Sequence, residues 1–411
     1  MLEAEISGYG ASGRNGGWVA GYVTGLEKYV ASLPMEKRRE CCQLLFKNVD
    51  DIGDVLQKES IDAHFHKAGV LYAAARYPEQ VALQKGVLEQ LYQAGHTEED
   101  CYWLGAAELQ EKVRLRNGLG AVYKRHCATI NPARMVTGLA KCVENAGVRI
   151  YENTRVRSFT SGEVKSEKGT VKAPVIVPAL EGYSSTVKGF GNHIIPVQSL
   201  IVATEPLSDA LWQEIGLEGR EAFCDGSRMV SYGQRTQDGR MVFGARGGYV
   251  YGGKPRSHFS LESDEFRVRE ELLYDLFPML RGVKIDFGWG GSLGVPRNFA
   301  PHAIFNPATG IGTAGGYGGQ GVGPSHLFGR TLADLILGRD TRRTQMPWVF
   351  KGISHRTALR TWEPEPCRWL TSKAIVKAFT HEENICLKNS GQSFSKSAAS
   401  QLSCALSKLM R

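Results

Sequence analysis

Two glycine-rich stretches, one near each end of the chain, hold the residues best suited to binding chemistry. The first covers residues 8–17 (GYGASGRNGG) and follows a short acidic segment, whereas the second covers residues 310–338 and follows a short apolar run. Five glycines lie between Gly315 and Gly321, and a helical pattern follows them. A strand, a glycine turn and a helix present unpaired backbone N–H groups that favour anionic ligand groups. For either stretch alone, the alternative is a tight turn that needs glycine for its positive φ.

The sequence around each stretch predicts the elements that would position it. Residues 311–314 (IGTA) are typical of a buried strand, and leucines at near-helical spacing predict a helix that ends at a C-cap glycine, Gly338. Residues 1–5 (MLEAE) are typical of the end of a strand, and they include the acidic Glu3. In the second strand of a dinucleotide-binding unit, a carboxylate at this point accepts the ribose hydroxyls.

The rest of the chain alternates helical and strand patterns. Asn131 is a helix N-cap with Pro132 at the first helical position, so a helix over 133–147 is expected, followed by a strand entry at 148–151. The other expected helices cover 26–60, 80–95 and 266–280, and the other expected strands cover 65–74, 169–177, 194–204, 229–232 and 241–244.

The composition is that of an ordinary globular protein. Hydrophobic residues make up 42% and charged residues 22% of the 411 residues, enough for one large or two interleaved domains. The net charge is +8, but the basic residues are interspersed with acids, which argues against nucleic-acid binding. The sequence has no apolar run long enough for a transmembrane segment. Nine cysteines without metal-ligand spacing, and acidic residues where a secretory leader would be basic, predict reduced thiols and a cytoplasmic protein.

Side chains of the usual catalytic kinds do not form a set in this sequence. His64 and His66 would share one face of a strand, but a third ligand is lacking, so no metal is expected. Ser-His-Asp sets and paired carboxylates are also lacking, so no acid–base residue is assigned. Tyr249 and Tyr251 would share one strand face, where they either line a pocket or only pack the sheet.

Together, the motifs resemble those of one flavoprotein superfamily. LEAE, GASGRNGG and the run from GGYGGQGV to GRTLADLILGRD are similar to segments of the FAD-dependent D-amino-acid-oxidase-like superfamily, and most of all to its amine-oxidising, γ-glutamylputrescine-oxidase-like branch. The resemblance covers residues 2–379. It implies a mixed α/β (α+β) fold, in which an FAD-binding Rossmann-like domain is interleaved with an antiparallel-sheet substrate domain.

The resemblance also implies where the domains lie. The FAD-binding domain would be discontinuous, over 1–60, 120–185 and 285–345, and the substrate domain would cover 61–119 and 186–284. A C-terminal extension would cover 346–385. The serine- and lysine-rich residues 386–411 match nothing in the family and predict a disordered tail.

Site residues follow from the matching motif positions. Those implied to contact FAD are Glu3, Ser12, Gly13, Arg14, Asn15, Gly16, Gly17, Val156, Gly318, Gly319, Gln320, Gly321 and Val322. Those implied to contact the substrate are Tyr249, Tyr251, Trp289 and Arg297. Leu293 occupies the place of an arginine that often clamps a substrate carboxylate in this family, which favours an amine substrate, although Arg297 could substitute for that arginine. Pro178 and Leu180 depart from the family pattern beside the flavin diphosphate.

The implied reaction is oxidation of the C–N bond of an amine or amino acid to an imine, with hydride passing to flavin N5. A small-molecule amine, and O₂ or another electron acceptor, are therefore the expected partners. An NAD(P)-linked dehydrogenase is the alternative enzyme class, and it is disfavoured because it has no use for the GASGRNGG loop.

One family motif has no counterpart in this sequence: the GxGxxG turn with its preceding strand and following helix. Either the chain begins at an internal methionine or the protein is naturally truncated. The alternative function is then a non-catalytic or unstable homologue that no longer binds FAD. Because loss of a central strand exposes a sheet edge and an apolar face, we expect residues 1–411 alone to aggregate, and an upstream βα unit to restore folding.

Overall fold

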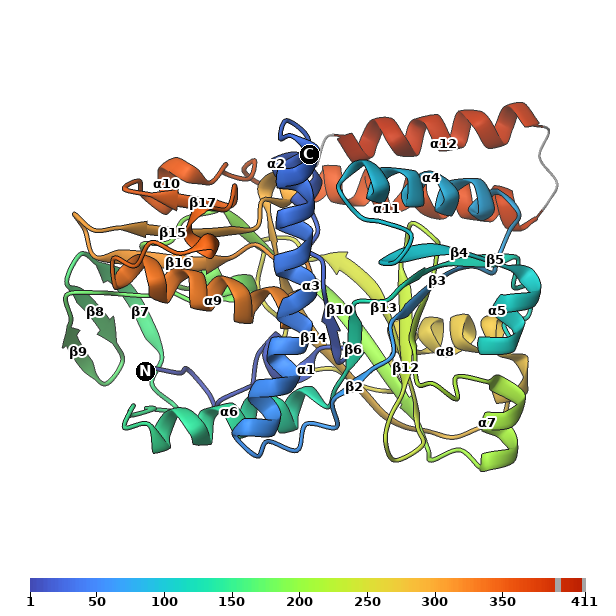
Figure 1. Ribbon diagram of the computed structural model, residues 1–411, viewed down its shortest axis with the longest axis horizontal. Coiled ribbons are helices and arrows are strands. Elements are labelled where there is room, and N and C mark those ends of the chain that lie inside the picture. Colours follow the sequence, from blue (N-terminus) through green and yellow to red (C-terminus); the bar gives the residue numbers. More distant parts are fainter. Residues whose placement is uncertain (389–392, 409–411) are drawn as a thin grey trace.

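The computed structural model describes residues 1–388 and 393–408, and a long helix, α3 (Met35–Lys58), stands between two groups of elements (Figure 1). Pro34 precedes its first turn, where a missing N–H costs nothing. Its buried side chains recur every three or four residues, as an amphipathic helix requires, and include Leu45, Val49, Ile52 and Leu56. In Figure 1, α9 (Val322–Ile336) and the strands within residues 156–172 and 302–351 lie to the left of α3, and most of the large sheet lies to its right.

The large sheet has eight strands in the order β14-β10-β13-β12-β11-β3-β5-β4. Their bounds are β3 (Val70–Ala74), β4 (Cys101–Gly105), β5 (Gly120–Lys124), β10 (Ile194–Thr204), β11 (Ala222–Asp225), β12 (Ser231–Arg235), β13 (Met241–Tyr249) and β14 (Ile285–Pro296). Neighbouring strands are antiparallel except β11 and β3, which are parallel. The sheet is therefore mixed, and the predicted mixed α/β fold is confirmed.

The two faces of this sheet have different neighbours. Leu200 of β10 packs in the largest core cluster with Phe266 of α8 (Asp264–Leu276), whereas the next residue, Ile201, packs with Trp289 of β14. Because successive strand side chains point to opposite faces, α8 covers one face and leaves the Trp289 face for other segments. Those segments are the two glycine-rich stretches.

Three smaller sheets complete the strands. The first contains β1 (Trp18–Ala20), β6 (Cys127–Thr129) and β2 (His66–Lys67), the second β16 (Ile311–Gly315), β15 (His302–Asn306) and β17 (Val349–Lys351), and the third β7 (Val156–Thr160), β8 (Glu163–Ser166) and β9 (Gly169–Lys172). Within these sheets β15 and β17 pair in parallel, and single parallel bridges occur outside them, among them Leu2 with Tyr151 and Ile176 with Ile311.

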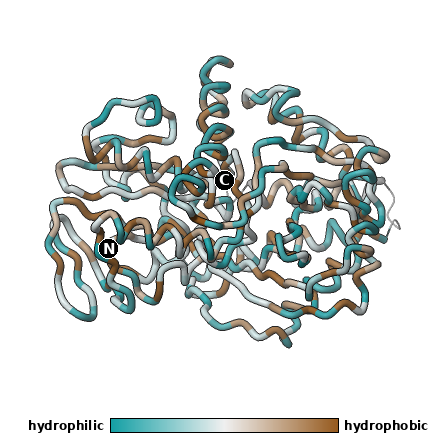
Figure 2. The backbone as a smooth tube through the Cα atoms, turned by 60° about the horizontal axis from the view of Figure 1, so that its bottom comes forward, coloured by the Kyte–Doolittle hydropathy of each residue, from teal (hydrophilic) through white to brown (hydrophobic). Residues whose placement is uncertain are grey.

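The remaining helices are mostly short. They are α1 (Ala11–Arg14), α2 (Leu26–Val30), α4 (Glu79–Gln93), α5 (Ala106–Lys112), α6 (Pro132–Asn145), α7 (Asp209–Ile215), α10 (His355–Ala358), α11 (Cys367–Leu387) and α12 (Ser393–Lys408), with 3₁₀ turns η1 (Glu181–Thr186), η2 (Pro278–Leu280), η3 (Arg297–Phe299) and η4 (Arg342–Gln345). Within the described residues, none combines the length and hydropathy of a membrane-spanning helix. Figure 2 shows apolar (brown) and hydrophilic (teal) residues interspersed along the chain.

Local signals placed two helix ends correctly. The side chain of Asn131 accepts the backbone N–H of Arg134 at 3.1 Å, so α6 is capped as expected. At the end of α9, Gly338 has φ +65°, and Arg339 donates its N–H to the carbonyl of Asp334 at 2.9 Å, which is the bonding of a Schellman motif.

Two strands of the large sheet come from ranges that we assigned to the FAD-binding domain. β5 lies within 120–185 and β14 within 285–345, and eleven residues of β14 pair with β10. Long-range pairing of this kind has no local signal in the sequence. The domain boundaries remain predictions.

The expected disordered tail was also wrong for most of its length. Helix α11 continues to Leu387, and α12 covers Ser393–Lys408 and packs beside α11 and α4 above the large sheet (Figure 1). Residues 389–392 and 409–411 of that prediction lie outside the described residues. Contacts from α12 hold this helix in place: Lys396 Nζ lies 2.7 Å from Glu79 Oε1 of α4, and Ser403 Oγ donates to the carbonyl of Ala378 in α11 at 3.3 Å.

Candidate functional site

The first glycine-rich stretch forms a compact loop around α1. Asn15 closes this loop, because its Nδ2 donates to the carbonyls of Ala11 at 3.1 Å and Ser12 at 2.9 Å, and its Oδ1 accepts the N–H of Gly17 at 2.8 Å. Gly17 has φ +74°, a conformation that other residues rarely adopt. At Gly13, a Cβ atom would overlap the carbonyl oxygen of residue 8. The predicted residues from 12 to 17 thus form one structural unit.

This loop lies across the Trp289 face of the large sheet. The indole Nε1 of Trp289 donates to the carbonyl of Arg14 at 3.0 Å, and Arg14 Nη1 donates to the carbonyl of Gly290 at 3.3 Å. On β12, Gln234 Nε2 donates to the carbonyl of Gly16 at 2.7 Å. Two strands of the large sheet therefore hold the loop. Sequence reasoning missed Gln234, which has no motif around it.

The second glycine-rich stretch turns from β16 into α9. Gly318 and Gly319 have φ +59° and +95°, so a side chain at either position would strain the turn. The Oε1 of Gln320 accepts a hydrogen bond from the Thr24 hydroxyl at 2.9 Å, and Gly321 is the N-cap of α9. The first-turn N–H groups of α9 have no acceptor within the helix.

Both glycine-rich stretches reach the same strand, β14. Leu293 Cδ1 lies 3.1 Å from the point that a Cβ atom on Gly319 would occupy, and Gly290, three residues earlier, accepts the hydrogen bond from Arg14. β1 connects the two stretches: Val19 belongs to the core cluster against which Val322 packs. Residues about 300 apart in sequence therefore converge on one face of the sheet.

The residues implied for the adenosine end also come together. Glu3 donates its N–H to the carbonyl of Tyr151 at 2.9 Å and accepts the N–H of Thr154 at 2.7 Å, two residues before Val156 begins β7. One oxygen of the Glu3 carboxylate accepts the N–H of Glu5 at 3.0 Å. In place of the expected strand over 1–5, the structure has one parallel bridge at Leu2.

A cavity of about 200 Å³ opens beside the first loop. Its walls come from that loop, the start of α6, the turn between β12 and β13, and β14, and among them are Gly13, Asn15, Gly16, Asn131, Arg220, Gln234 and Trp289. Ligand pockets commonly measure about 300–1,000 Å³, so this cavity is small for a cofactor. Trp289 is the predicted substrate residue that lines it.

The two predicted tyrosines lie elsewhere. β13 ends at Tyr249, so the expected strand face shared with Tyr251 does not form, and strand alternation no longer applies. Tyr249 is buried and donates its hydroxyl to Glu365 Oε1 at 2.6 Å. Tyr251 is 58% exposed and packs edge-on against Trp369 at 6.0 Å between ring centroids.

Arg297 is likewise engaged by the C-terminal part of the chain. Its guanidinium pairs with Glu363 at 2.9 Å and lies 5.2 Å from the ring centroid of Trp362. The structure therefore separates Tyr249, Tyr251 and Arg297 from Trp289 and groups the three with residues 362–369. An anionic substrate group would have to displace Glu363 from Arg297.

Glu181, which sequence reasoning missed, is in direct contact with the glycine turn. Its Oε1 accepts the N–H of Gly316 at 2.5 Å, and the N–H of Tyr317 also donates to this carboxylate. Burial of the carboxylate raises the pKa of Glu181 to about 7, although these hydrogen bonds act in the opposite direction. The sequence offered one signal for this residue: an acidic side chain next to Pro178 and Leu180, the two positions at which the chain departs from the family pattern.

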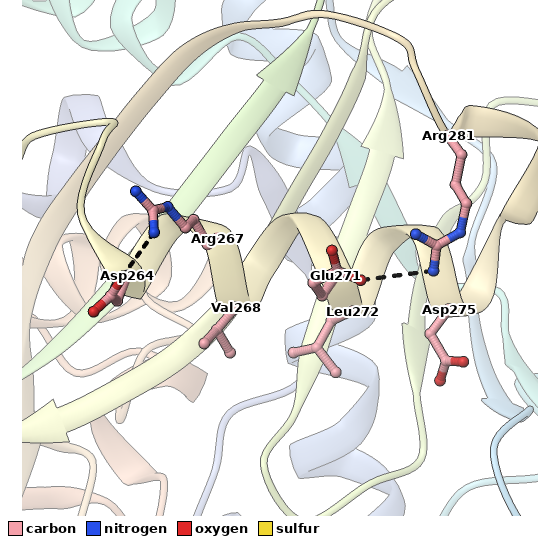
Figure 3. A pocket seen from close by; sticks show the side chains of 7 residues that line it. All are labelled: Asp264, Arg267, Val268, Glu271, Leu272, Asp275 and Arg281. Carbon is pink, nitrogen blue, oxygen red and sulfur yellow. Dashed lines mark hydrogen bonds and ion pairs between the residues drawn. The ribbon is translucent and has the colours of Figure 1, made fainter.

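A hollow on the outer face of α8 is a surface feature of a different kind (Figure 3). Its side chains pair with one another: Asp264 lies 3.3 Å from Arg267, and Glu271 lies 3.6 Å from Arg281. These side chains are more than half exposed, so each pair contributes little to stability. The hollow lies on the α8 face, opposite the glycine-rich stretches.

Solved structures with a similar fold include a glycine oxidase and an iminodiacetate oxidase. Glycine oxidase from Geobacillus kaustophilus matches with a TM-score of 0.65 and 19% identity, covering 83% of this chain and 88% of that one. Iminodiacetate oxidase (IdaA) from Chelativorans sp. BNC1 matches with a TM-score of 0.64 and 13% identity, covering 86% and 99%. At such identities the likeness concerns the fold alone.

Sequence comparison identifies the family. The model of the DAO family, described as FAD dependent oxidoreductase, matches residues 1–335, and the chain belongs to this family. The probable oxidoreductase OrdL of Haemophilus influenzae is 28% identical over 370 residues, covering 86% of this chain and 79% of that protein. Gamma-glutamylputrescine oxidoreductase of Escherichia coli is 27% identical over 344 residues, covering 82% and 78%. The predicted family and its cofactor, FAD, are thus confirmed.

Proposed function

We propose that this FAD-dependent oxidoreductase oxidises the C–N bond of a small amine. One observation carries the proposal: the two stretches implied to contact the flavin meet on β14, through Arg14 with Gly290 and Gly319 with Leu293. A flavin between a glycine turn and this sheet face would have its ring beside Trp289. The similarity to gamma-glutamylputrescine oxidoreductase supports an amine as the substrate class.

The residues present suit the polar groups of FAD. The N–H groups of Gly316 and Tyr317 already bind an anionic oxygen, that of Glu181, so their chemistry fits a phosphate or another electron-rich oxygen. Glu3 and Val156 would hold the adenosine end, and the turn from Gly318 to Val322 would hold the flavin end. When bound, FAD supplies the two-electron acceptor for C–N oxidation.

The chain's own residues would orient the amine and limit the approach of water. Trp289 and Val242 give the cavity an apolar side, and Leu293 offers no charge to a substrate carboxylate. At Leu293 the carboxylate of an α-amino acid would find no partner, so an uncharged amine suits this part of the site better. An α-amino acid would have to pair its carboxylate with Arg220, which also lines the cavity. Donors at the start of α9 would stabilise negative charge on a reduced cofactor.

A second candidate function is a homologue that does not bind FAD. The observation in its favour is that the cavity measures only about 200 Å³ while Glu181 holds the glycine turn. In that case the chain would have the fold of the family but would not catalyse the oxidation. The two candidates differ in one measurable property, the presence of bound flavin.

The first experiment is the visible absorption spectrum of the purified 411-residue chain before and after addition of FAD. We expect a protein-bound flavin spectrum that bleaches anaerobically with gamma-glutamylputrescine and much less with glycine. Bleaching with glycine but not with gamma-glutamylputrescine would mean that the substrate is an amino acid and not an amine. A folded protein that stays colourless would favour the non-binding homologue. Re-oxidation in air, with peroxide formation, would identify O₂ as the electron acceptor.

A pair of glycine variants on one segment tests the location of the flavin. Gly319→Val should abolish flavin binding, because φ is +95° there and a Cβ atom would lie only 3.1 Å from Leu293 Cδ1. Gly329→Ala, in α9, meets no atom within 4 Å and should bind flavin like the parent protein. Equal binding by both variants would place the flavin elsewhere.

A further inference from the structure

Glu181 occupies an unusual position at the first residue of η1. Its φ is +40°, in the left-handed region that non-glycine residues seldom adopt and that often marks functional sites. The residue as a whole is partly exposed, yet its carboxylate points inward to the glycine turn. Strain at the backbone and placement of the carboxylate therefore occur at the same residue.

Two glycines leave the space that this carboxylate fills. A Cβ atom on Gly294 of β14 would overlap Glu181 Oε2, and a Cβ atom on Gly315 of β16 would overlap Glu181 Oε1. The N–H groups of Gly316 and Tyr317 then donate to the carboxylate. Three segments thus form a cradle for one anionic group, and a residue of the chain itself fills it.

The surroundings of the cradle contain few other charges. The titratable side chains that face Glu181 are Tyr317, whose pKa burial raises well above its ordinary value, and His302 of β15, whose pKa burial lowers to about 4. Both therefore stay neutral between pH 6 and pH 8. Among the described residues, no lysine or arginine forms an ion pair with Glu181. Glu181 is thus the group in the cradle that changes charge in this range.

From this geometry we infer that Glu181 is an internal competitor of FAD. Its carboxylate holds the anion-binding N–H groups while the cofactor is absent, and it has to leave the cradle before FAD binds. The inference rests on the proposed function, because it takes the glycine turn as part of the FAD site. The ligand group that replaces the carboxylate is a phosphate of the FAD diphosphate, which is anionic and suits the same donors.

Two consequences distinguish a competitor from a structural support. Ionised Glu181 repels a diphosphate and binds the N–H groups tightly, whereas protonated Glu181 does neither. With a pKa of about 7, about nine-tenths of the carboxyls are protonated at pH 6 and about one-tenth at pH 8. If FAD binds the protonated form, its apparent Kd rises about tenfold between these values, in proportion to the competent fraction. A structural support would instead help to hold FAD, and its removal would weaken binding.

The test is the Kd of FAD, measured by quenching of flavin fluorescence at pH 6 and pH 8, for the 411-residue chain and two variants. We expect the parent to bind about tenfold more weakly at pH 8. Glu181→Gln keeps the shape of the side chain and should bind equally at both values, with the affinity that the parent has at pH 6 or better. Glu181→Ala opens the cradle and should also bind without pH dependence.

Two controls isolate the mechanism. Glu214→Gln removes one exposed carboxylate from α7 and should keep the pH dependence of the parent. Riboflavin has no phosphate, so its binding should not depend on pH in any of the proteins. Circular dichroism and thermal melting of each variant establish that it is folded.

Each other outcome counts against the inference in its own way. Equal affinity at both pH values in the parent, or weaker binding by Glu181→Gln, would overturn it and make Glu181 a structural support. The absence of FAD binding by every folded protein at both pH values would overturn this inference and the proposed FAD site together. The first result leaves the proposed function standing, and the second does not.

Discussion

At the scale of single residues, two titratable side chains next to the glycine turn matter most, and neither belongs to a recognisable motif. Glu181 has a pKa raised to about 7, and His302 has a pKa lowered to about 4, both because burial disfavours the charged form. The Nδ1 of His302 donates to the carbonyl of Ala300 at 3.0 Å, and its Nε2 has no hydrogen-bond partner among the described residues. The turn is therefore bordered by two groups that resist charging.

His302 should make the folded state less stable in mild acid. A histidine that is neutral when folded and has an ordinary pKa when unfolded binds its proton only on unfolding. The unfolding free energy then falls as the pH decreases from about 6.5 to about 4. His302→Asn, whose amide can still donate to Ala300, should remove about 1.4 kcal/mol per pH unit from that slope. Urea unfolding of parent and variant across this range measures the difference.

The slope has to be compared between parent and variant, because Glu181 changes the unfolding free energy with pH in the direction opposite to His302. Its folded pKa is above the unfolded value, so between about pH 4.5 and pH 7 it lowers stability as the pH rises. His258→Asn, an exposed histidine, is the matched control and should leave the slope unchanged. A His302→Asn slope equal to that of the parent would mean that His302 charges freely in the folded protein.

At the scale of elements, α11 is held by largely buried ion pairs to the loops that follow β3 and β11 of the large sheet. Glu382 of α11 makes a two-point contact with Arg228 at 2.7 and 3.2 Å, and Glu383 lies 3.0 Å from Arg76. The Glu383 side chain is 8% exposed and that of Arg76 is 9% exposed. Pairs that are buried to this degree specify how the helix docks, because an unpaired buried charge is costly.

Removing one member of this set should loosen α11 and α12. Glu382→Ala leaves Arg228 without its carboxylate, and we expect a loss of about 3 kcal/mol, the low end for a buried pair, because Arg228 is partly exposed. Hydrogen exchange of residues 367–388 would report faster opening of α11. Asp264→Ala breaks an exposed pair on α8 and should change stability by less than about 0.5 kcal/mol. Unchanged exchange in Glu382→Ala would mean that apolar contacts alone hold the helix.

At the scale of the whole molecule, several large apolar side chains near the single parallel bridges are exposed. Met1 is 61% exposed, Ile6 55%, Tyr151 49% and Val177 46%. All four lie in or beside the segments that form single parallel bridges, where a continuous sheet would bury such side chains. Exposed apolar side chains and unpaired strand edges promote association between copies of a chain.

We therefore expect the 411-residue chain to associate as its concentration rises. Replacing Ile6 by Ser and Val177 by Thr should reduce light scattering and binding of a hydrophobic dye, because both changes lower the apolar character of this surface. Leu337→Ser is the matched control, because Leu337 is 60% exposed at the end of α9. A soluble, cooperatively melting parent protein that binds no dye would contradict the prediction of aggregation.

Local sequence signals determined much of this protein before its tertiary structure was considered. Asn131 and Pro132 start α6, and Gly338 ends α9, because caps act through neighbouring backbone groups. The glycines at 17 and 319 have the positive φ that their loops required. These motifs also carried the resemblance from which the family was predicted, and the family match confirmed it.

Only the tertiary structure decided which distant segments meet. It placed β14 in the large sheet, Arg297 on Glu363, α11 on Arg228, and Glu181 in the cradle of the glycine turn. In each case the partner lies tens to hundreds of residues away, and the choice depends on the space and the unpaired donors that remain after packing. The residues next to a charged side chain in the sequence do not indicate which distant group it will contact. Neither the occupied cradle nor the docked C-terminal helices could therefore be derived from the sequence.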